Sequence, residues 1–416
     1  MWLSRSGARC TIKTTSSASF GKSPADGCAF TYDGDYVGTG GPAIAHTLPL
    51  QEAPHTTEYR LPPFFDNLVA EGWLRNAQAR ALGVNPDDRF ALLLAFRRDC
   101  AGAVSVIDPE PKGKLELDAA DQESIAGLAA RASLSRIQLK LTVVRTVQGF
   151  RPARATEFGS HIAKLPSGEL PDIIELEWLT AQATRKLLPE EQVAEMEVAA
   201  LGNIAGEALF VRRFDRTLEG RKVHFEEFNQ LLGKFSFAKY DGSYEDMARF
   251  IRETLACIPA EAERLFRRVL ARFLTGDTDA HLKNFAMLHT SQGLRLAPSY
   301  DLVACSFYRQ FDTIALAVAG AADLRIGTLQ PKHIVAFGKG YGLSPAVIRL
   351  AVADLAKRLD AAKTAVAESG AGHPGLRDGI IDIMEKRWNG TFASIGQFLS
   401  KKRGGGGKSS GLLSNG

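Results

Sequence analysis

The stretch GDTDAHLKNF, residues 276–285, gives the strongest indication of this chain's fold. It follows AERLFRRVLARFL, residues 262–274, whose apolar spacing predicts an amphipathic helix. Gly276 suits the C-cap of that helix, and the apolar run FAML after the polar residues predicts a short buried strand. Two acids, a histidine, a lysine and an asparagine therefore gather at one helix-to-strand turn. Taken alone, such a segment favours a solvated turn over a functional site.

The composition is that of a soluble globular protein of two or three packed units, with 416 residues of which 45% are hydrophobic and 24% charged. The net charge of +4 is mild, and no stretch interleaves clustered lysine and arginine with aromatic residues, so direct nucleic-acid binding is not expected. No run approaches the roughly eighteen apolar residues of a membrane span. The five cysteines lack the spacing of a disulfide framework or a zinc site, and we expect a reducing, cytoplasmic location.

The chain divides into segments that differ in composition. Residues 1–27 are basic and rich in serine, threonine and glycine, which predicts a flexible lead-in, with a transit peptide as the alternative. Residues 401–416 cannot bury apolar surface and predict a disordered tail. Between them we expect an N-terminal α+β unit over 28–110, a β-rich lobe over 111–222 and a helical lobe over 223–400. This order is typical of a bilobal nucleotide-binding enzyme of the α+β class.

Within the first unit, AFTYDGDYVGTG predicts a β-hairpin around Asp33 and Gly34. Sixteen residues after the polar run that ends at Phe285, APSYDL places Asp301 at the end of the next apolar strand. Phosphoryl transfer to a hydroxyl needs a carboxylate base, oxygen ligands for Mg²⁺ and a lysine for the nucleotide phosphates. Asp279 fits the base, and Asn284 together with Asp301 fits the Mg²⁺ ligands.

Lys164 in HIAKLP is the candidate for the phosphate-binding lysine, because a charge in the middle of a strand is unusual without a partner. Glu177, on the following predicted helix, could be that partner. Each residue also has an ordinary explanation: Asp279 and Asp301 as turn acids, His281 as a structural histidine, and Lys164 as an outward-facing lysine of an edge strand. Their ordered occurrence across a β-to-α transition favours the functional interpretation.

Several longer runs strengthen this interpretation. They are LPPFFDNLVAEG, RDCAGAV, SLSRIQLKL, HIAKLP, RRFDR, HFEEFNQLLG, GDTDAHLKNF and APSYDL. In their order and spacing the sequence resembles the HipA-like serine/threonine kinases, the toxin components of bacterial HipA/HipB toxin–antitoxin systems. The resemblance extends from about Cys28 to the helices near residue 395. It implies a bilobal protein-kinase-like fold that uses ATP and Mg²⁺.

The resemblance also assigns roles to individual residues. Lys164 stands where the family has its ATP lysine, and Asp279 stands where it has its catalytic aspartate. Asn284 and Asp301 match the two Mg²⁺ ligands. His281 matches the histidine of the catalytic loop, which we expect to support that loop.

The run RASLSRIQLK, residues 131–140, is implied to form the ATP-binding loop. The residues expected at the nucleotide are Ser135, Arg136, Gln138 and Lys140. Ser133 matches the position that HipA-like kinases autophosphorylate, and Ser135 makes this a two-serine version of the motif. Arg136 departs from the family, which has glycine there; arginine lacks the backbone freedom of glycine but supplies a cation for phosphate. Arg212 is a second departure, at a place where an acid or a neutral residue is usual.

The resemblance implies a toxin kinase that phosphorylates a cytoplasmic translation factor, such as an aminoacyl-tRNA synthetase. It further implies self-inhibition by loop-serine phosphorylation and a HipB-like helix-turn-helix antitoxin as partner, with DNA reached only through that antitoxin and no membrane contact. Two alternatives stay open. A small-molecule phosphotransferase would use the same acids and asparagine, although such enzymes rarely carry a segment like LPPFFDNL. The departure at Arg136 leaves room for a catalytically weak, nucleotide-binding corepressor.

Overall fold

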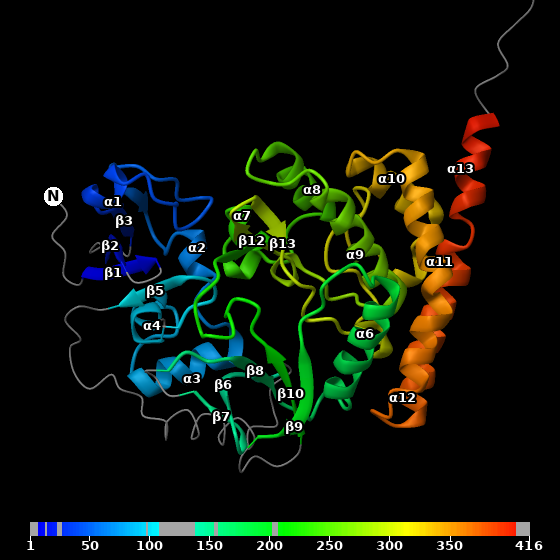
Figure 1. The fold of residues 1–416 in the computed structure, drawn as a ribbon, viewed down its shortest axis with the longest axis horizontal. Helices are drawn as coiled ribbons and strands as arrows, with labels where there is room; N and C mark the ends of the chain where they lie inside the picture. The colour runs from blue at the N-terminus through cyan, green and yellow to red at the C-terminus, as the bar shows by residue number, and fades with distance from the viewer. Residues whose placement is uncertain are drawn as a thin grey trace, which may run out of the picture.

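The computed structural model describes residues 7–12, 15–22, 27–96, 99–107, 138–153, 157–201 and 207–404. Within these residues the chain forms an N-terminal α+β unit, a five-stranded lobe and a helix-rich lobe (Figure 1). The N-terminal unit lies at one end of the molecule, and the long C-terminal helices lie at the other.

The N-terminal unit is built on one antiparallel sheet. Its elements are β1 (Gly7–Ile12), β2 (Thr15–Lys22), β3 (Cys28–Tyr32), α1 (Gly34–Gly38), β4 (His55–Thr57), α2 (Pro63–Asp66), α3 (Gly72–Leu82), α4 (Arg89–Phe96) and β5 (Val104–Ile107). The strand order is β4-β3-β2-β1-β5. Phe20 of β2 stacks on Phe65 of α2 at 4.6 Å and packs against Phe90 of α4 at 5.2 Å between ring centroids. These aromatic contacts fix the helices on the sheet.

Two expectations for this unit are wrong. The segment expected as a flexible lead-in over residues 1–27 contributes β1 and β2, which pair with each other and with β5 and β3. Asp33 and Gly34 do not form a hairpin, because Asp33 instead caps α1 and accepts a hydrogen bond from the Asp35 N–H at 3.0 Å. A serine- and threonine-rich strand lacks the alternation that would reveal it, and an aspartate suits a helix N-cap as well as a turn.

The five-stranded lobe contains β6 (Lys140–Thr146), β7 (Gly149–Pro152), β8 (His161–Lys164), α6 (Ile173–Leu187), β9 (Met196–Ala200) and β10 (Glu207–Arg212). Its antiparallel sheet has the order β7-β6-β8-β10-β9. β8 therefore lies between β6 and β10, so that Lys164 belongs to an interior strand. The apolar face of α6 joins the main core of the helix-rich lobe, which makes this helix a bridge between the lobes.

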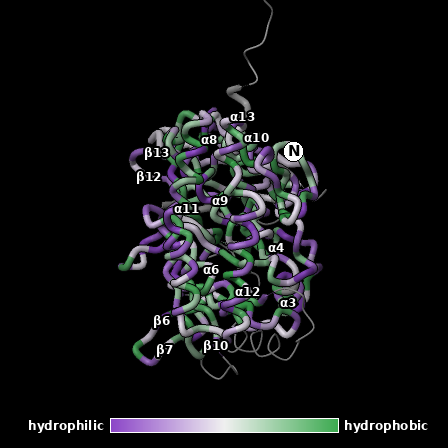
Figure 2. Tube along the Cα trace, turned by 90° about the vertical axis from the view of Figure 1, so that its right-hand side faces the viewer, coloured by the Kyte–Doolittle hydropathy of each residue, from purple (hydrophilic) through white to green (hydrophobic). Residues whose placement is uncertain are grey.

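The helix-rich lobe contains β11 (Phe225–Glu227), α7 (Phe228–Leu231), α8 (Tyr244–Glu253), α9 (Glu261–Thr275), β12 (Ala286–Thr290), β13 (Gly293–Leu296), α10 (Pro331–Gly340), α11 (Pro345–Ala367), α12 (Pro374–Arg387) and α13 (Ile395–Gly404). Each of α10, α11 and α12 begins with a proline, which suits the first helical position because its missing N–H has no partner there. In Figure 2, hydrophobic and hydrophilic residues alternate along these helices, as amphipathic packing requires.

The expectations for this lobe need two corrections. It is not all-helical: the short strands expected at FAML and before Asp301 are β12 and β13, and with β11 they form a three-stranded sheet that carries the polar loop at one end. The disordered tail expected over 401–416 does not begin at residue 401, since α13 continues to Gly404. Residues 405–416 and the expected linker over 108–114 lie outside the described residues. In the described part of the chain, no helix is both long and apolar enough to cross a membrane.

Candidate active site

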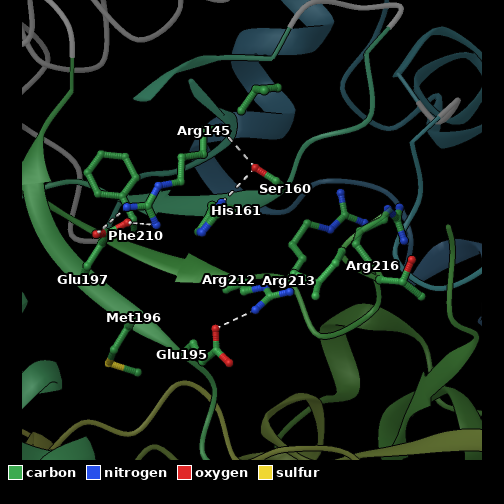
Figure 3. Close-up of a pocket in the computed structure, with 13 residues that line it drawn as sticks. Arg145, Ser160, His161, Glu195, Met196, Glu197, Phe210, Arg212, Arg213 and Arg216 are labelled. Atoms are coloured by element: carbon green, nitrogen blue, oxygen red, sulfur yellow. Dashed lines mark hydrogen bonds and ion pairs between the residues drawn. The ribbon is translucent and has the colours of Figure 1, made fainter. Parts of the chain in front are cut away.

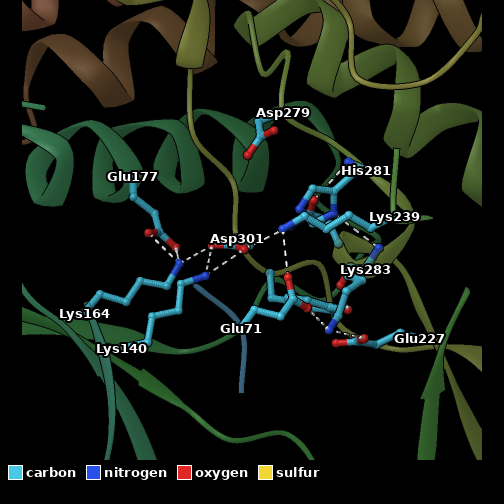
Figure 4. A network of polar contacts seen from close by, with 12 residues as sticks. Glu71, Lys140, Lys164, Glu177, Glu227, Lys239, Asp279, His281, Lys283 and Asp301 are labelled. Carbon is cyan, nitrogen blue, oxygen red and sulfur yellow. Dashed lines mark hydrogen bonds and ion pairs between the residues drawn. The ribbon is translucent and has the colours of Figure 1, made fainter. Parts of the chain in front are cut away.

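Lys140 and Lys164 face each other across β6 and β8, and both reach Asp301. The two lysines are direct cross-strand partners in the antiparallel ladder, an arrangement in which like charges repel. The Asp301 carboxylate accepts from both: Lys140 Nζ lies 3.0 Å from Oδ2, and Lys164 Nζ donates to Oδ1 (Figure 4). An anion at this position neutralises the paired lysines.

Lys164 has a second anionic partner on α6. Its Nζ lies 2.5 and 2.7 Å from the two carboxylate oxygens of Glu177, and the two residues are 4% and 0% exposed. Burial alone lowers the pKa of Lys164, but Asp301 and Glu177 outweigh it and raise that pKa above its usual range. Burial raises the pKa of Glu177, and the attraction of Lys164 opposes that rise. Lys164 is thus a buried cation held between two acids.

Asn284 holds the other side of Asp301. Its Nδ2 donates to Asp301 Oδ2 at 2.9 Å, while its Oδ1 accepts the His281 backbone N–H at 2.9 Å. Burial raises the pKa of Asp301, but Lys140 and Lys164 outweigh this and hold it well below its usual range. Asp301 also has a φ of 54°, in the left-handed region that residues other than glycine rarely occupy. The turn after β13 therefore turns this carboxylate toward the lysines.

His281 supports the turn that presents Asn284. It caps the 3₁₀ turn Leu282–Asn284, and its Nδ1 accepts the Lys283 backbone N–H at 3.3 Å. Burial lowers the pKa of His281 to about 3, so the imidazole is neutral at physiological pH. The Tyr240 ring packs edge-on against it at 5.1 Å. These contacts give His281 a supporting place in the loop.

Asp279 lies in the same loop and opens to solvent. Its Oδ1 accepts a hydrogen bond from the Tyr240 hydroxyl at 3.0 Å. Partial desolvation by the neighbouring residues raises the pKa of Asp279, and the Tyr240 hydrogen bond opposes this rise. Figure 4 shows Asp279 beside the Asp301 group, and among the described residues no ion pair or hydrogen bond joins the two carboxylates to a common partner. Asp279 is thus a carboxylate that a substrate hydroxyl can reach.

Comparison with known proteins identifies the family. The model of the HipA-like C-terminal domain matches residues 124–363, which is more than half of the chain. The chain belongs to the HipA family. The model of the HipA N-terminal domain matches residues 11–107 as well. The HipA domains thus account for both the N-terminal unit and the lobes that carry the site.

Relatives of this HipA-family chain are bacterial proteins. It is 34% identical over 274 residues to the Sinorhizobium fredii protein Y4dM, named as a candidate kinase, in a match that covers 62% of this chain and 65% of that protein. The chain thus spans slightly less than two thirds of that relative. It is 27% identical over 373 residues to the Shewanella oneidensis serine/threonine-protein kinase toxin HipA, covering 80% of this chain and 83% of the toxin.

A solved structure matches the fold. The HipA chain from the Shewanella oneidensis complex of HipA, HipB and operator DNA superposes with a TM-score of 0.76 at 20% sequence identity. The match covers 93% of this chain and 99% of that chain. The architecture is therefore the α+β kinase-like fold of HipA.

Sequence reasoning missed two residues that hold this HipA-family site together. Arg272, in the last turn of α9, pairs with Asp277 and donates to three backbone carbonyl oxygens of the site. Those carbonyls belong to Asn284 at 3.2 Å, Tyr300 at 2.9 Å and Asp301 at 3.1 Å. The arginine is 2% exposed. In the sequence, its position on an otherwise apolar helix face could have indicated a buried, paired charge.

The second missed residue is Glu71, which belongs to the N-terminal unit. Its carboxylate lies 2.6 Å from Lys283 Nζ, in the loop that carries Asp279 and Asn284, and 3.3 Å from Lys239 Nζ (Figure 4). Burial raises the pKa of Glu71, but Lys283 and Lys239 outweigh this and lower it to about 2. Lys283 also lies 3.6 Å from Glu227. Glu71 lies inside the run LPPFFDNLVAEG, which carries part of the family resemblance. Nothing in the sequence indicated that Glu71 contacts Lys283.

The expected ATP-binding loop is described only in part. Ser133, Ser135 and Arg136 lie outside the described residues. Gln138 is half-buried, and its Nε2 has no hydrogen-bond partner among the residues that the structure describes. Lys140, expected at the nucleotide, reaches the Asp301 group as given above.

A cavity of about 450 Å³ opens elsewhere on the five-stranded lobe (Figure 3). His161 lines it from the start of β8, and because side chains alternate along a strand, His161 and Lys164 lie on opposite faces of the sheet. All four of its arginines are paired: Arg145 with Glu197 at 2.9 Å, Arg212 with Glu195 at 2.7 Å, and Arg213 and Arg216 with Asp99 at 2.7 and 2.5 Å. Arg212, the second departure from the family, thus forms a partly exposed ion pair on the face away from Asp301.

Proposed function

We propose that this protein is an ATP-dependent serine/threonine protein kinase. The observation that carries the proposal is the shared contact of Lys140 and Lys164 with Asp301, because two facing lysines at one acid form a site suited to phosphate oxygens. In phosphoryl transfer, a strand lysine that pairs with a helix glutamate contacts the nucleotide phosphates. Lys164 and Glu177 have that relationship.

The donor set next to these lysines suits Mg²⁺. Asp301 offers a carboxylate, and among the described residues the Asn284 Oδ1 accepts a single hydrogen bond, which leaves a second lone pair. Hard oxygen ligands of this kind, completed by substrate phosphates and water, are what Mg²⁺ prefers. Asn284 and Asp301 would hold the ion, which neutralises charge on the phosphates when bound.

Asp279 would accept the proton of the attacking serine or threonine hydroxyl. It is exposed, its pKa is raised toward the range of a useful base, and the Tyr240 hydroxyl fixes its orientation. Lys164 would orient the phosphates, and the neutral His281 would hold the loop in place. The hydroxyl oxygen then forms the new bond to phosphorus while the bond to the ADP oxygen breaks.

The biological role that we propose is that of a toxin. Shewanella oneidensis HipA is named a serine/threonine-protein kinase toxin, and a solved HipA chain occurs in a complex with HipB and operator DNA. By this similarity we propose a HipB-like helix-turn-helix antitoxin as partner, with DNA contacted through it. The substrate would be a cytoplasmic translation factor, such as an aminoacyl-tRNA synthetase.

We also propose that phosphorylation of Ser133 or Ser135 switches the kinase off. A phosphoserine carries about −1.5 to −2 charges, which would compete with ATP for the cations of the site. Mass spectrometry of the wild-type protein beside Asp279→Asn tests this, together with the activity of Ser133→Asp and Ser135→Asp. Unmodified serines in active protein, or full activity of both aspartate variants, would contradict self-inhibition.

A catalytically weak corepressor is the second candidate, because Lys140 and Lys164 already neutralise Asp301 and Arg136 replaces the loop glycine. Equilibrium dialysis of ATP with Mg²⁺, beside a measurement of ADP release, separates the candidates. The kinase proposal predicts binding and turnover together. Binding without any turnover, in the presence of protein substrates, would favour the corepressor.

A further inference from the structure

Three side chains with metal-binding atoms meet on one face of the β11–β12 ladder, apart from the Asp301 group. His224 precedes β11 and lies opposite His289 of β12, with the His289 N–H donating to the His224 carbonyl at 3.0 Å. Glu226 is two residues beyond His224 and therefore points to the same face. One ligand atom from each of the three residues lies within 4.8 Å of the others. The strand register thus creates the cluster.

Glu226 is a buried acid that lacks a strong cationic partner. It is 0% exposed, and its Oε1 accepts from the His46 N–H at 2.9 Å and from His289 Nε2 at 3.0 Å. Its Oε2 is buried and has no hydrogen-bond partner in the part of the chain that the structure describes. In the described ranges no lysine or arginine lies within ion-pair distance of Glu226. A buried carboxylate is costly unless a cation compensates it, so the site calls for positive charge.

His224 offers a second unused group. Its Nε2 is buried and makes no hydrogen bond of ordinary length to the described residues, although the Ile44 backbone lies near enough to interact with the ring. Its Nδ1 receives the Ala103 N–H at 3.3 Å, a long contact. Gly102 has a φ of 73°, and a side chain there would meet His224 Nδ1 at 3.1 Å, so the chain comes close to the ring at this point. The His289 side chain is 29% exposed, which gives an ion a way in from solvent.

We propose that His224, Glu226 and His289 bind a divalent transition-metal ion of the Zn²⁺ class. Two imidazoles and one carboxylate form a common three-ligand zinc set and leave the fourth position open. Nitrogen ligands favour Zn²⁺, Co²⁺ or Ni²⁺ over Mg²⁺, which distinguishes this site from the all-oxygen pair Asn284 and Asp301.

The ion would join two parts of the molecule. His46 and Ala103 belong to the N-terminal unit, and their N–H groups contact Glu226 and His224 directly. Glu226 and His289 belong to the sheet of the helix-rich lobe, and His224 directly precedes it. The ion would therefore stabilise the attachment of the N-terminal unit to the lobe that carries the catalytic loop. This role is structural and does not depend on the proposed kinase activity.

The test uses Co²⁺ as a spectroscopic probe for the full-length protein after chelator treatment. We expect one equivalent of Co²⁺ to bind with a visible d–d absorption, to be displaced by Zn²⁺, and to raise the melting temperature. Glu226→Gln, which preserves side-chain shape, and His289→Ala should each weaken Co²⁺ binding by about tenfold or more. The control His373→Ala removes an imidazole that is 57% exposed and lies outside the cluster, and it should bind Co²⁺ like the wild type.

Circular dichroism of each variant shows whether it is folded, and only folded variants are compared. The absence of a one-equivalent Co²⁺ complex in the wild-type protein would overturn the proposal. Binding of equal strength in wild type, Glu226→Gln and His289→Ala would overturn it too, because the ion would then lie elsewhere. In either case the cluster is a set of histidine–carboxylate hydrogen bonds without an ion.

Discussion

At the scale of single residues, the structure rules out one explanation of Lys164, that of an outward-facing lysine on an edge strand. A lysine on a surface strand could be removed at little cost in stability, but Lys164 is buried between Glu177 and Asp301. Its removal leaves Glu177 buried without a partner. The same burial explains why this lysine could be recognised in the sequence, as a charge inside an apolar strand. The sequence offered Glu177 only as a possible partner and did not predict the contact with Asp301.

We predict that Lys164→Met lowers the free energy of unfolding by roughly 3–5 kcal/mol, because it breaks a buried ion pair. The double variant Lys164→Met, Glu177→Gln removes the orphaned acid and should recover most of that loss. ATP affinity should stay low in both variants, since neither has the lysine. Urea unfolding and equilibrium dialysis measure the two effects. Wild-type ATP affinity in the double variant would show that Lys164 does not bind nucleotide.

The lowered pKa of His161 should make the stability of the folded protein depend on pH. Burial, followed by the charges of Arg145 and Arg212, lowers the pKa of His161 to about 4 from an ordinary value of 6.5. The folded state thus disfavours the protonated ring, so stability is complete above about pH 6.5 and falls as the pH drops toward 4. His161→Gln should reduce this loss by up to roughly 3 kcal/mol. Identical stability-against-pH curves for wild type and variant between pH 4 and 6.5 would contradict the assignment.

At the scale of elements, α9 and the loop after it act together through Arg272. Gly276 ends the helix with a φ of 79°, and Arg272 reaches forward to the carbonyls of the loop and of the turn at Asp301. A planar guanidinium can donate to several acceptors at once, whereas a lysine ammonium cannot reproduce that fork. One residue of α9 thereby holds both segments that carry Asn284 and Asp301.

We predict that Arg272→Lys lowers the free energy of unfolding by about 2–3 kcal/mol, because buried acceptors lose charged hydrogen bonds. Phosphate transfer should fall more than tenfold, since small displacements of positioned groups are costly in rate. Arg249→Lys on α8 is the matched control, because Arg249 is 61% exposed. Equal unfolding energies for Arg272→Lys and Arg249→Lys would refute the bracing role of Arg272.

Element prediction succeeded where sequence patterns are strong. The apolar spacing of residues 262–274 predicted α9, and the chain between Ile173 and Leu187 is the helix that its pattern indicated. It failed at β1 and β2, because their serine- and threonine-rich sequence lacks alternation and because β1 pairs with β5, which lies about ninety residues later in the chain. It failed at Asp33 because aspartate is common both at a helix N-cap and in a hairpin turn, so the residue alone does not distinguish the two. Local chemistry was readable, but pairing between distant segments was not.

At the scale of the whole molecule, the N-terminal unit reaches the loop that carries Asp279 and Asn284. Glu71 contacts Lys283, which lies between His281 and Asn284. No local pattern could predict this contact, because the residues are far apart in sequence and each is an ordinary surface type. The ion-pair network of Asp99 with Arg213 and Arg216 joins the same unit to the segment after β10. The N-terminal unit is thus attached at both lobes.

We predict that Glu71→Gln slows phosphate transfer by about tenfold without preventing folding, since the loop loses a charged support about 2 kcal/mol in strength. Glu52→Gln, at an exposed site of the same unit, is the control. Steady-state kinetics with a protein substrate, beside thermal unfolding, gives the comparison. If Glu71→Gln matches Glu52→Gln in rate, the N-terminal unit does not position the loop.

We propose that Asp279 is the base of a phosphoryl-transfer site assembled by Lys164, Asn284 and Asp301. The most direct measurement is the rate of γ-phosphate incorporation into protein, followed by intact mass and by labelled ATP, for wild type and for Asp279→Asn. If Asp279 is the base, we expect Mg²⁺-dependent incorporation by the wild type and a rate about 10²–10⁴-fold lower in the folded Asp279→Asn variant. Incorporation by Asp279→Asn at the wild-type rate would contradict it.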